Sequence, residues 1–528
     1  MLPQHPLLSL ASLGSLASDP YIIAILVYLL ALTGVGAYKA KSVKDSSDFM
    51  VAGRSLPWYV LVGTLLATWI GNGSLFGGAG LGYRNGLAGL WNSCGAWAGI
   101  VIVYFIAKRV RNVGKVTVPE IFEARYGRSA GVLATLITII AYLTIVSYQF
   151  KGGGKVLSIV TEGGISVESG IIITAVFAIG YTVLAGMMSV VYTDVVNGVL
   201  MIFGILAALV YLVLQVGGPA EVFSVADELG RSSLFGQWGL ERSGNTSAPI
   251  IAISFMVPTM LLLLGDANCY QRIFSAKDGG SAKKAVFFWV IGVVLLESSI
   301  SFLGLTGAVA ETTGAMAASD LPRLLADGSL NPAWQSMAEG IIPRVAMHLP
   351  VALGMVLVAT MMAVIVSTAD SFLLIPATNL TRDVYQRFFN PKATERAVVL
   401  ISRFFILGLG AIAYMLVNSF PTILQAAYTA YLIYGAAITP ALLAAFMSKR
   451  VTKAGAVASI LSGSAVTLIW TFYFAKTGAL NYEAWHPFLK EVTYPAAGLS
   501  IFMLFGVSLL GRAPSKEVWG PFFIEDEH

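Results

Sequence analysis

The chain has 528 residues, of which 57% are hydrophobic and only 12% are charged, and its formal net charge is +5. About a quarter of the residues of a soluble domain are charged, so this composition excludes a soluble multidomain protein and a disordered chain. Two cysteines exclude a disulfide-rich secreted scaffold, and basic residues scattered over short segments argue against nucleic-acid binding.

Thirteen apolar runs are long enough to cross a bilayer as helices, because a crossing takes about 20 residues. They span 21–38, 57–84, 88–107, 130–158, 168–187, 191–216, 248–270, 284–309, 347–379, 397–418, 421–446, 453–475 and 492–511. They are too long and too uniformly apolar for the strands of a β-barrel. No basic stretch precedes the first run and no small-residue cleavage site follows it, so we expect a retained helix. The sequence therefore predicts an all-α polytopic membrane protein.

The basic residues indicate how the chain crosses the membrane. With the N-terminus outside, 23 of the 33 lysines and arginines fall in inside connections, 7 in outside connections and 3 within spans. Lysine and arginine are enriched on the cytoplasmic side of membrane proteins. We therefore predict a cytoplasmic C-terminus, with the polar connections 217–247 and 310–346 outside as loops that contain short helices. The expected location is the plasma membrane, or the inner membrane of a Gram-negative cell.

Two of the predicted spans contain residues that interrupt a helix at mid-membrane depth. The first carries the sequence GNGS at 71–74, and the second carries Pro258 and then GDAN at 265–268. Unwound backbone is tolerated inside a membrane only where it lines a site or is buried in protein. Paired interruptions at corresponding positions of two halves are typical of a transporter site. The alternative is that these glycines only allow close helix packing.

Ionisable residues inside the spans need a reason, because each costs on the order of 3 kcal/mol to insert. They are Lys151, Lys155, Asp194, Asp266, Glu297, Asp370 and Arg403. Asp370 shares a helix face with Ser367 and Ser371, and an oxygen-only ligand set suits Na⁺ better than a transition metal. The alternative is that the hydroxyls bond to their own helix backbone, which leaves the aspartate unexplained.

The residues leave the nature of the solute open. Trp69 lies at the first interruption, and Tyr428, Tyr431 and Tyr434 form a stripe that lines a pocket or only packs. Asp266 beside aromatic side chains favours a cationic or zwitterionic solute, whereas Lys151 favours a carboxylate or forms a structural ion pair. Neither a Walker motif nor a catalytic constellation is found, so we expect no ATP drive and no enzyme.

At this point the chain resembles the sodium/solute symporter family, which includes sugar, proline, pantothenate, sialic-acid and choline symporters. The resemblance covers about 20–510. It rests on the order of GRSLPW at 53–58, GNGS at 71–74, VTVPE at 116–120, YTD at 192–194, QR at 271–272, AK at 276–277, STADS at 367–371 and RDVY at 382–385.

The resemblance implies sodium-driven uptake by alternating access and a five-plus-five inverted repeat. The repeats would be 57–216 and 248–446, each beginning with a discontinuous helix, separated by the outside loop 217–247. Segment 1–56 would hold an outside N-terminus, one extra helix and an inside loop. Segment 447–528 would hold two further helices and a short cytoplasmic tail.

The resemblance also implies ligands, carried over position by position. One sodium ion would be bound by carbonyls of Ala67, Ile70 and Val364 and by hydroxyls of Ser367 and Thr368. A second cation would be bound by Asp194, Asp370 and Ser371. This sequence has Asp370 where members with a second sodium have serine, which makes a proton an alternative to that ion.

The family's substrate positions correspond to side chains in several predicted spans. With Lys151 added from its place in a span, the candidate set is Trp69, Ser74, Tyr83, Trp91, Lys151, Asp266, Tyr428 and Tyr431. Tyr434 belongs to the same stripe.

We therefore expect a sodium-coupled secondary symporter that imports a small polar organic solute and works as a monomer in the lipid bilayer. The alternatives are a proton-coupled or passive transporter of the same fold, or a solute sensor.

Overall fold

The structure is a computed structural model that describes residues 18–40, 50–235, 248–326 and 331–524, apart from 475, 476, 478 and 481–484. Within these ranges the fold is helical, with an isolated β-bridge between Leu56 and Ala276. Twelve helices in the described ranges are long and apolar enough to cross a membrane. These findings confirm the all-α polytopic membrane fold.

Eleven of the expected spans are each one continuous helix in the described part of the chain. They are α2 (Pro20–Ala40), α6 (Leu90–Asn112), α8 (Arg128–Val160), α9 (Val167–Ala185), α10 (Met187–Gln215), α15 (Gly279–Thr312), α18 (Val351–Asn379), α19 (Glu395–Met415), α20 (Ile423–Met447), α21 (Lys453–Ile469) and α24 (Thr493–Leu510). A π-helical turn, η4 (Leu380–Phe389), extends α18, and another, η6 (Trp470–Phe474), extends α21.

The remaining two spans are discontinuous, as predicted. The first consists of α4 (Trp58–Trp69), the π-helical turn η2 (Gly73–Gly78) and α5 (Ala79–Asn85). The second consists of α13 (Ala248–Gly265) and α14 (Ala267–Phe274). The twelve helices differ from the thirteen expected spans because α4 alone is too short to cross. Its continuation joins α6 through η3 (Gly86–Gly89) in one stretch from Gly73 to Asn112.

The prediction that Pro258 interrupts the second span is wrong. Helix α13 continues through Pro258 and ends at Gly265, so the break lies at Asp266. A proline removes a single N–H donor, and neighbouring helices in a membrane protein can satisfy the freed backbone. Helix α13 therefore tolerates Pro258 in its interior, whereas Asp266 is the N-cap of a new helix, α14.

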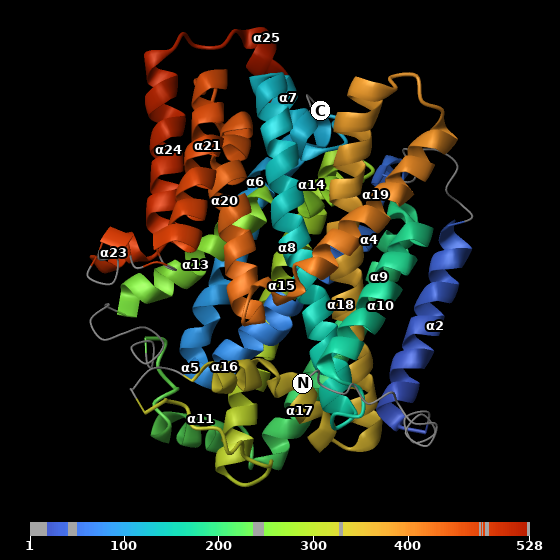
Figure 1. Cartoon of the computed structure of the whole chain (residues 1–528), viewed down its shortest axis with the longest axis vertical. Coiled ribbons are helices and arrows are strands. Elements are labelled where there is room, and N and C mark those ends of the chain that lie inside the picture. The colour runs from blue at the N-terminus through green and yellow to red at the C-terminus, as the bar shows by residue number, and fades with distance from the viewer. Residues whose placement is uncertain are drawn as a thin grey trace, which may run out of the picture.

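The two ends of the helix bundle carry different short elements (Figure 1). One end carries α5, α11 (Pro219–Glu228), α16 (Pro332–Glu339) and α17 (Ile341–His348), and we call it the predicted outer end. The opposite end carries α7 (Val118–Tyr126) and α25 (Lys516–Trp519), and we call it the predicted inner end. The short helices expected in the two long loops are therefore present, although 236–247 of the first loop lies outside the described residues.

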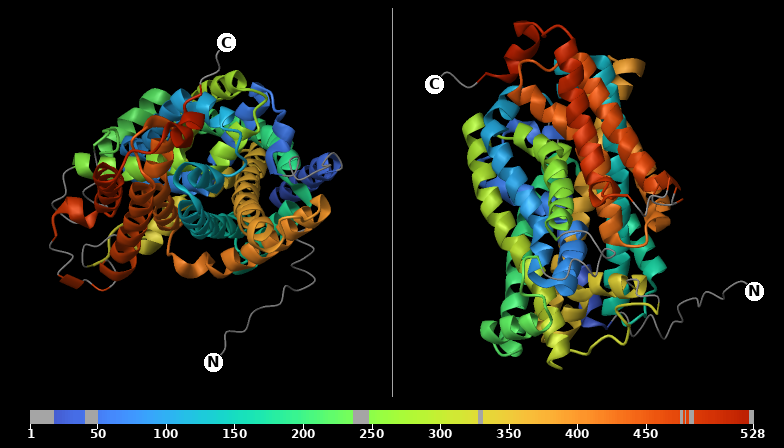
Figure 2. Two further views of the ribbon diagram at one scale, coloured as in Figure 1. Left: turned by 90° about the horizontal axis from the view of Figure 1, so that it is seen from above. Right: turned by 90° about the vertical axis from the view of Figure 1, so that its left-hand side faces the viewer.

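Large apolar side chains cover the outside of the bundle as well as its core. Leu30, Val176, Phe203, Phe404 and Phe502 are each more than 65% exposed. Of the helices that carry them, α2, α19 and α24 lie at the edge of the bundle in the view from above (Figure 2). An apolar surface on this scale is unsuited to water and fits the hydrocarbon of a bilayer.

Candidate functional site

The break in the first discontinuous helix is stabilised by side chains of α8. Helix α4 ends at Trp69, and Ile70 has an extended conformation with φ −72° and ψ 99°. Gln149 Oε1 accepts a hydrogen bond from Asn72 N at 3.2 Å, and Asn72 Nδ2 donates to the carbonyls of Tyr148 and Gln149. These contacts replace the helical hydrogen bonds that the break removes, as a membrane interior requires.

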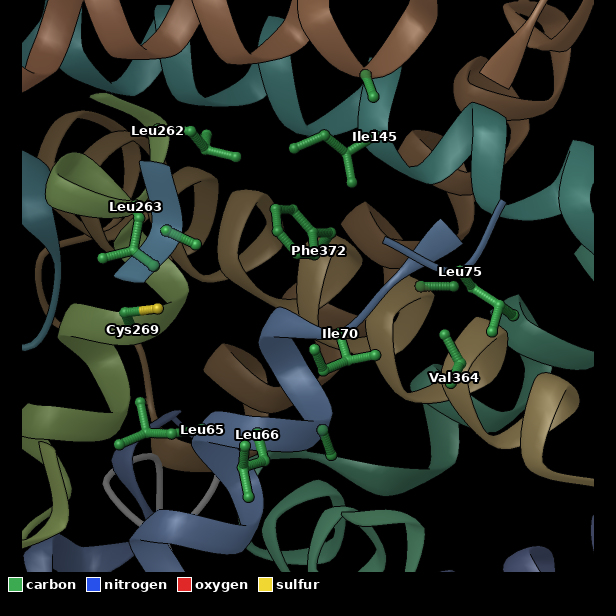
Figure 3. Close-up of a cluster of buried hydrophobic side chains, with 14 of the residues drawn as sticks. Leu65, Leu66, Ile70, Leu75, Ile145, Leu262, Leu263, Cys269, Val364 and Phe372 are labelled. Carbon is green, nitrogen blue, oxygen red and sulfur yellow. The ribbon is translucent and has the colours of Figure 1, made fainter. Parts of the chain in front are cut away.

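Apolar packing holds the break in place from several directions. Ile70 lies between Leu66 on α4 and Leu75 beyond the break, with Val364 of α18 nearby (Figure 3). Gly71 lies between α8 and α18, where an added Cβ atom would be 3.0 Å from both Gln149 Nε2 and Thr368 Cγ2. A glycine at 71 thus lets α18 approach the unwound backbone closely.

The five residues predicted to bind sodium lie together at this break. Ser367 Oγ is 3.1 Å from the carbonyl oxygen of Ala67 and 3.3 Å from that of Val364. Thr368 Oγ1 is 3.2 Å from the carbonyl oxygen of Ile70. The two hydroxyls and three carbonyls form a group of oxygens between α4 and α18. Such a group suits a small hard cation.

The three residues predicted to bind a second cation do not lie at one site in the structure. Asp194 Oδ2 forms a buried ion pair with Arg272 at 3.2 Å and accepts from the Thr64 hydroxyl at 2.7 Å. Arg272 also donates to Ser371 Oγ at 2.6 Å and to Thr64 Oγ1 at 3.0 Å. Asp370 instead contacts Thr182 Oγ1 at 2.8 Å. The arginine, known from the sequence only as part of the QR motif at 271–272, thus joins α4, α10, α14 and α18.

Trp69 and Ser74, two predicted substrate residues, meet at a third acidic side chain. The carboxylate of Glu297 on α15 accepts from Trp69 Nε1 and from Ser74 Oγ, both at 3.0 Å. Trp97 Nε1 of α6 donates to its second oxygen at 3.1 Å. The sequence identified Glu297 only as an ionisable residue inside a span. Its place beside the break depends on contacts across more than 200 residues of chain.

Asp266 caps the second half of the other discontinuous helix. Its side chain accepts from Asn268 N at 3.3 Å and from Cys269 Sγ at 3.0 Å, and Tyr142 OH also donates to it. The residue is fully buried. An aspartate in this position satisfies the free N–H groups at the start of α14.

The tyrosine stripe of α20 lies against the first break. Tyr431 packs so closely on Gly73 that an added Cβ atom would overlap its hydroxyl oxygen. Tyr428 OH donates to Asn92 Oδ1 at 2.7 Å, and Tyr434 OH donates to the carbonyl of Gly265 at 2.9 Å. Tyr431 and Tyr434 thus reach the two breaks, whereas Tyr428 lies towards α6.

Tyr83 and Trp91 lie towards the predicted outer end, in other contacts. Tyr83 OH donates to Glu311 at 2.7 Å, and Glu311 pairs with Arg344 at 2.6 Å. Trp91 Nε1 donates to the carbonyl of Leu234 at 2.9 Å. These contacts connect loop helices to the bundle, and they do not bring the two side chains to the first break.

Lys151 and Lys155 of α8 hold the start of α20. Lys151 Nζ donates to the carbonyls of Phe420 and Pro421 at 2.6 and 3.1 Å. Lys155 pairs with Glu339 at 3.0 Å, and Glu339 accepts from the N–H groups of Ile423 and Leu424. Glu339 therefore caps α20, where a negative charge is favourable. The structure places Lys151 in this outer contact.

The two ends of the bundle differ in how they are closed. At the predicted outer end, a cavity of about 520 Å³ is lined by Arg84, Glu339, Phe420, Gln425, Tyr428 and Phe472, among others. At the predicted inner end, the bridge between Leu56 and Ala276 ties the start of α4 to the residues after α14. Leu56 N donates to Ser275 O at 3.1 Å, and Lys277 N donates to Leu56 O at 2.9 Å.

Curated relatives align with nearly the whole chain. The osmoregulated proline transporter OpuE of Bacillus subtilis is 26% identical over 96% of this chain and 98% of its own length. A sodium/proline symporter of Escherichia coli is 26% identical over 97% of both chains.

Solved structures share the fold at lower identity. A substrate-bound, outward-open Na⁺-coupled sialic acid symporter matches with a TM-score of 0.76 and 17% identity, over 94% of this chain and 98% of that one. Mhp1, a nucleobase-cation-symport-1 family transporter, matches with a TM-score of 0.56 and 13% identity, over 90% of this chain and 97% of that one.

A family model for the sodium:solute symporter family matches residues 49–463, a range that contains both discontinuous helices and the oxygen group at Ser367 and Thr368. The chain belongs to the sodium:solute symporter family.

Proposed function

We propose that this protein is a sodium-coupled secondary symporter that imports a small polar organic solute by alternating access. The observation that carries the proposal is the approach of the Ser367 and Thr368 hydroxyls to the carbonyls of Ala67 and Ile70. Sodium would be bound by these four groups and the carbonyl of Val364. Family membership and the sodium-coupled relatives support the same conclusion.

The oxygen group lies at the same break as the proposed solute pocket, which gives a physical basis for coupling. Sodium bound between α4 and α18 would fix the unwound segment 70–72, and the solute would bind to that segment from the other side. Each ligand would then favour the conformation that the other binds, and this dependence is reciprocal. Trp69, Ser74 and Tyr431 are the predicted substrate residues that lie closest to the break and best support this role.

A second cation is a separate proposal, with Asp194 and Ser371 as its ligands. The Thr64 hydroxyl contacts both Asp194 and Arg272, so oxygens from α4, α10 and α18 surround this ion pair. Asp370 accepts from Thr182 of α9 and lies apart from the Asp194–Arg272 pair, which favours a proton rather than a metal ion there. Counting sodium ions per solute in the wild type and in Asp194→Asn tests the second ion.

We further propose that the protein acts as a monomer in the plasma membrane, with its N-terminus outside and its C-terminus in the cytoplasm. The distribution of lysine and arginine supports this orientation.

The test is uptake by purified protein in proteoliposomes, with and without an inward sodium gradient. L-Proline is one probe, because two relatives are named for it, and choline, glycine betaine, D-glucose and lactate widen the panel. Accumulation of a probe that requires the sodium gradient supports the proposal. Equal accumulation driven by a proton gradient alone, or flux that never exceeds equilibrium, would replace sodium symport with one of the two alternatives.

A further inference from the structure

Glu297 is a buried carboxylate whose hydrogen-bond donors surround the first break. Its side chain lies at the middle of α15, and the residue is 2% exposed. Trp69 donates from the end of α4, Ser74 from η2 and Trp97 from α6. Three separate segments therefore direct polar hydrogens at one carboxylate, an arrangement that stabilises a negative charge.

No ion pair in the described part of the chain includes Glu297. Three other carboxylates of the bundle have cationic partners: Asp194 pairs with Arg272, Glu311 with Arg344 and Glu339 with Lys155, whereas Asp266 and Asp370 are held by hydrogen bonds. A carboxylate at membrane depth is costly unless it is neutralised or serves a function. Glu297 thus has hydrogen-bond donors but no cation among the described residues to neutralise it.

The donors around Glu297 are accessible, although they lie deep in the bundle. Trp69 and Ser74 are only half-buried, whereas their neighbours Thr68, Ile70 and Gly73 are buried. A solute that reaches the break would therefore meet the indole of Trp69 and the hydroxyl of Ser74 directly in front of the carboxylate. A cationic group there could take the place of the Ser74 hydroxyl at Glu297 and contact the face of the indole, which attracts cations.

Asp266, the other acidic candidate, has less room for such a role. It is fully buried, and its oxygens accept from Tyr142, Cys269 and the backbone of α14. Lys151, the candidate that favoured an anionic solute, donates to Phe420 and Pro421 at the predicted outer end. The charged group that faces the first break is therefore negative.

We propose that Glu297 binds a positively charged nitrogen of the solute, so that the solute is an amino acid, an amine or a quaternary ammonium compound. This inference rests on the proposed function as a symporter, because it assigns the solute of the same site. Sugars and simple carboxylates are excluded as preferred solutes. Trp69 and Trp97 orient the carboxylate, and Ser74 marks the side from which the nitrogen approaches.

The experiment measures thermal stabilisation of the full-length protein in detergent at fixed Na⁺ concentration. The probes are L-proline, choline and glycine betaine, which carry a cationic nitrogen, and D-glucose and lactate, which do not. We expect a stabilising shift with at least one of the first three and none with the last two. Glu297→Gln should weaken the apparent affinity for the active probe at least tenfold, and Glu297→Asp should retain the preference with a smaller loss.

Matched controls separate this inference from the proposed function. Glu311→Gln changes a second, half-buried glutamate of α15 that lies in the outer contact with Tyr83, and it should leave probe affinity unchanged. Stabilisation by Na⁺ alone should persist in Glu297→Gln, which also shows that the variant is folded. If Na⁺ alone does not stabilise the wild type, the result contradicts the proposed sodium symport and not the role of Glu297 in solute binding.

Three results would overturn the inference. They are a shift with glucose or lactate only, wild-type affinity of Glu297→Gln for the active probe, and no shift with any of the three nitrogen compounds while Na⁺ still stabilises the protein.

Discussion

The hydroxyl of Tyr431 rests against the backbone of Gly73, with no room between them for a methyl group. Gly73→Ala should therefore push α20 away from the first break and abolish transport, although the protein should still be produced. Tyr431→Phe removes the overlapping oxygen, and the ring carbon behind it is 3.5 Å from the added Cβ, an ordinary contact distance. The double variant Gly73→Ala with Tyr431→Phe should therefore recover part of the activity. The measurement is uptake per amount of folded protein.

Gly34→Ala is the matched control for this prediction, because nothing lies within 4 Å of a Cβ at Gly34 in α2. It should transport like the wild type. Undiminished uptake by Gly73→Ala would mean that the contact with Tyr431 is not kept during the transport cycle.

Thr368→Ala should raise the Na⁺ concentration needed for half-maximal uptake at least fivefold, and Ser367→Ala should act in the same way. Each change removes one oxygen from a group that no water inside the bilayer replaces. Coupling between ion and solute is typically about 1–3 kcal/mol and reciprocal, so solute affinity at fixed Na⁺ should fall as well. Thr368→Ser, which keeps the hydroxyl, should remain close to wild type, and an equal loss in that variant would contradict the sodium assignment.

Asp194→Asn and Asp370→Asn should differ in stability although both remove a buried aspartate charge. The first leaves the guanidinium of Arg272 buried without its ion-pair partner, which typically costs about 3–5 kcal/mol. The second keeps a group able to hydrogen-bond to Thr182 and leaves no cation unpaired, so the loss should be about 1 kcal/mol or less. Thermal unfolding of the purified variants gives the order, and a reversed order would show that Arg272 does not depend on Asp194.

Cysteines at Ser232 and Lys283 test the orientation in the membrane. Ser232 follows α11 at the predicted outer end, and Lys283 lies in the first turns of α15 at the predicted inner end. An impermeant thiol reagent applied to intact cells should label the first and not the second. The native Cys269 is buried and Cys94 is half-buried, so the wild type provides the background. Labelling of position 283 alone would invert the topology.

The positions of the helices could be predicted because each depends on a local run of apolar residues. The break at 71–74 was also visible, since glycines weaken a helix wherever they occur. The interruption predicted at Pro258 is absent, because the effect of a proline depends on which neighbouring group satisfies the freed carbonyl. The sequence does not show which group that is. The proposed sodium ligands could be named only through the family's motifs, because Ala67 and Ile70 would contribute backbone oxygens, which carry no residue signature.

Arg272, Glu297 and Glu339 show where the sequence is silent. The role of each becomes clear only when its partners are known, and these partners are distant along the chain. Asp194 is 78 residues from Arg272, and Ile423 is 84 residues from Glu339. Ser74 and Trp69 are 223 and 228 residues from Glu297. The insertion cost of a charge marks such residues as unusual, but it does not distinguish an ion pair from a helix cap or a binding group.

The bridge between Leu56 and Ala276 joins two segments through main-chain hydrogen bonds, so the free energy of these two bonds depends little on which side chains the segments carry. Its two hydrogen bonds are worth about 0.5–1.5 kcal/mol each, so opening it costs no more than thermal fluctuation supplies on the timescale of a transport cycle. It joins the start of α4 to the residues after α14, so the two discontinuous helices separate at the predicted inner end only when both main-chain hydrogen bonds open.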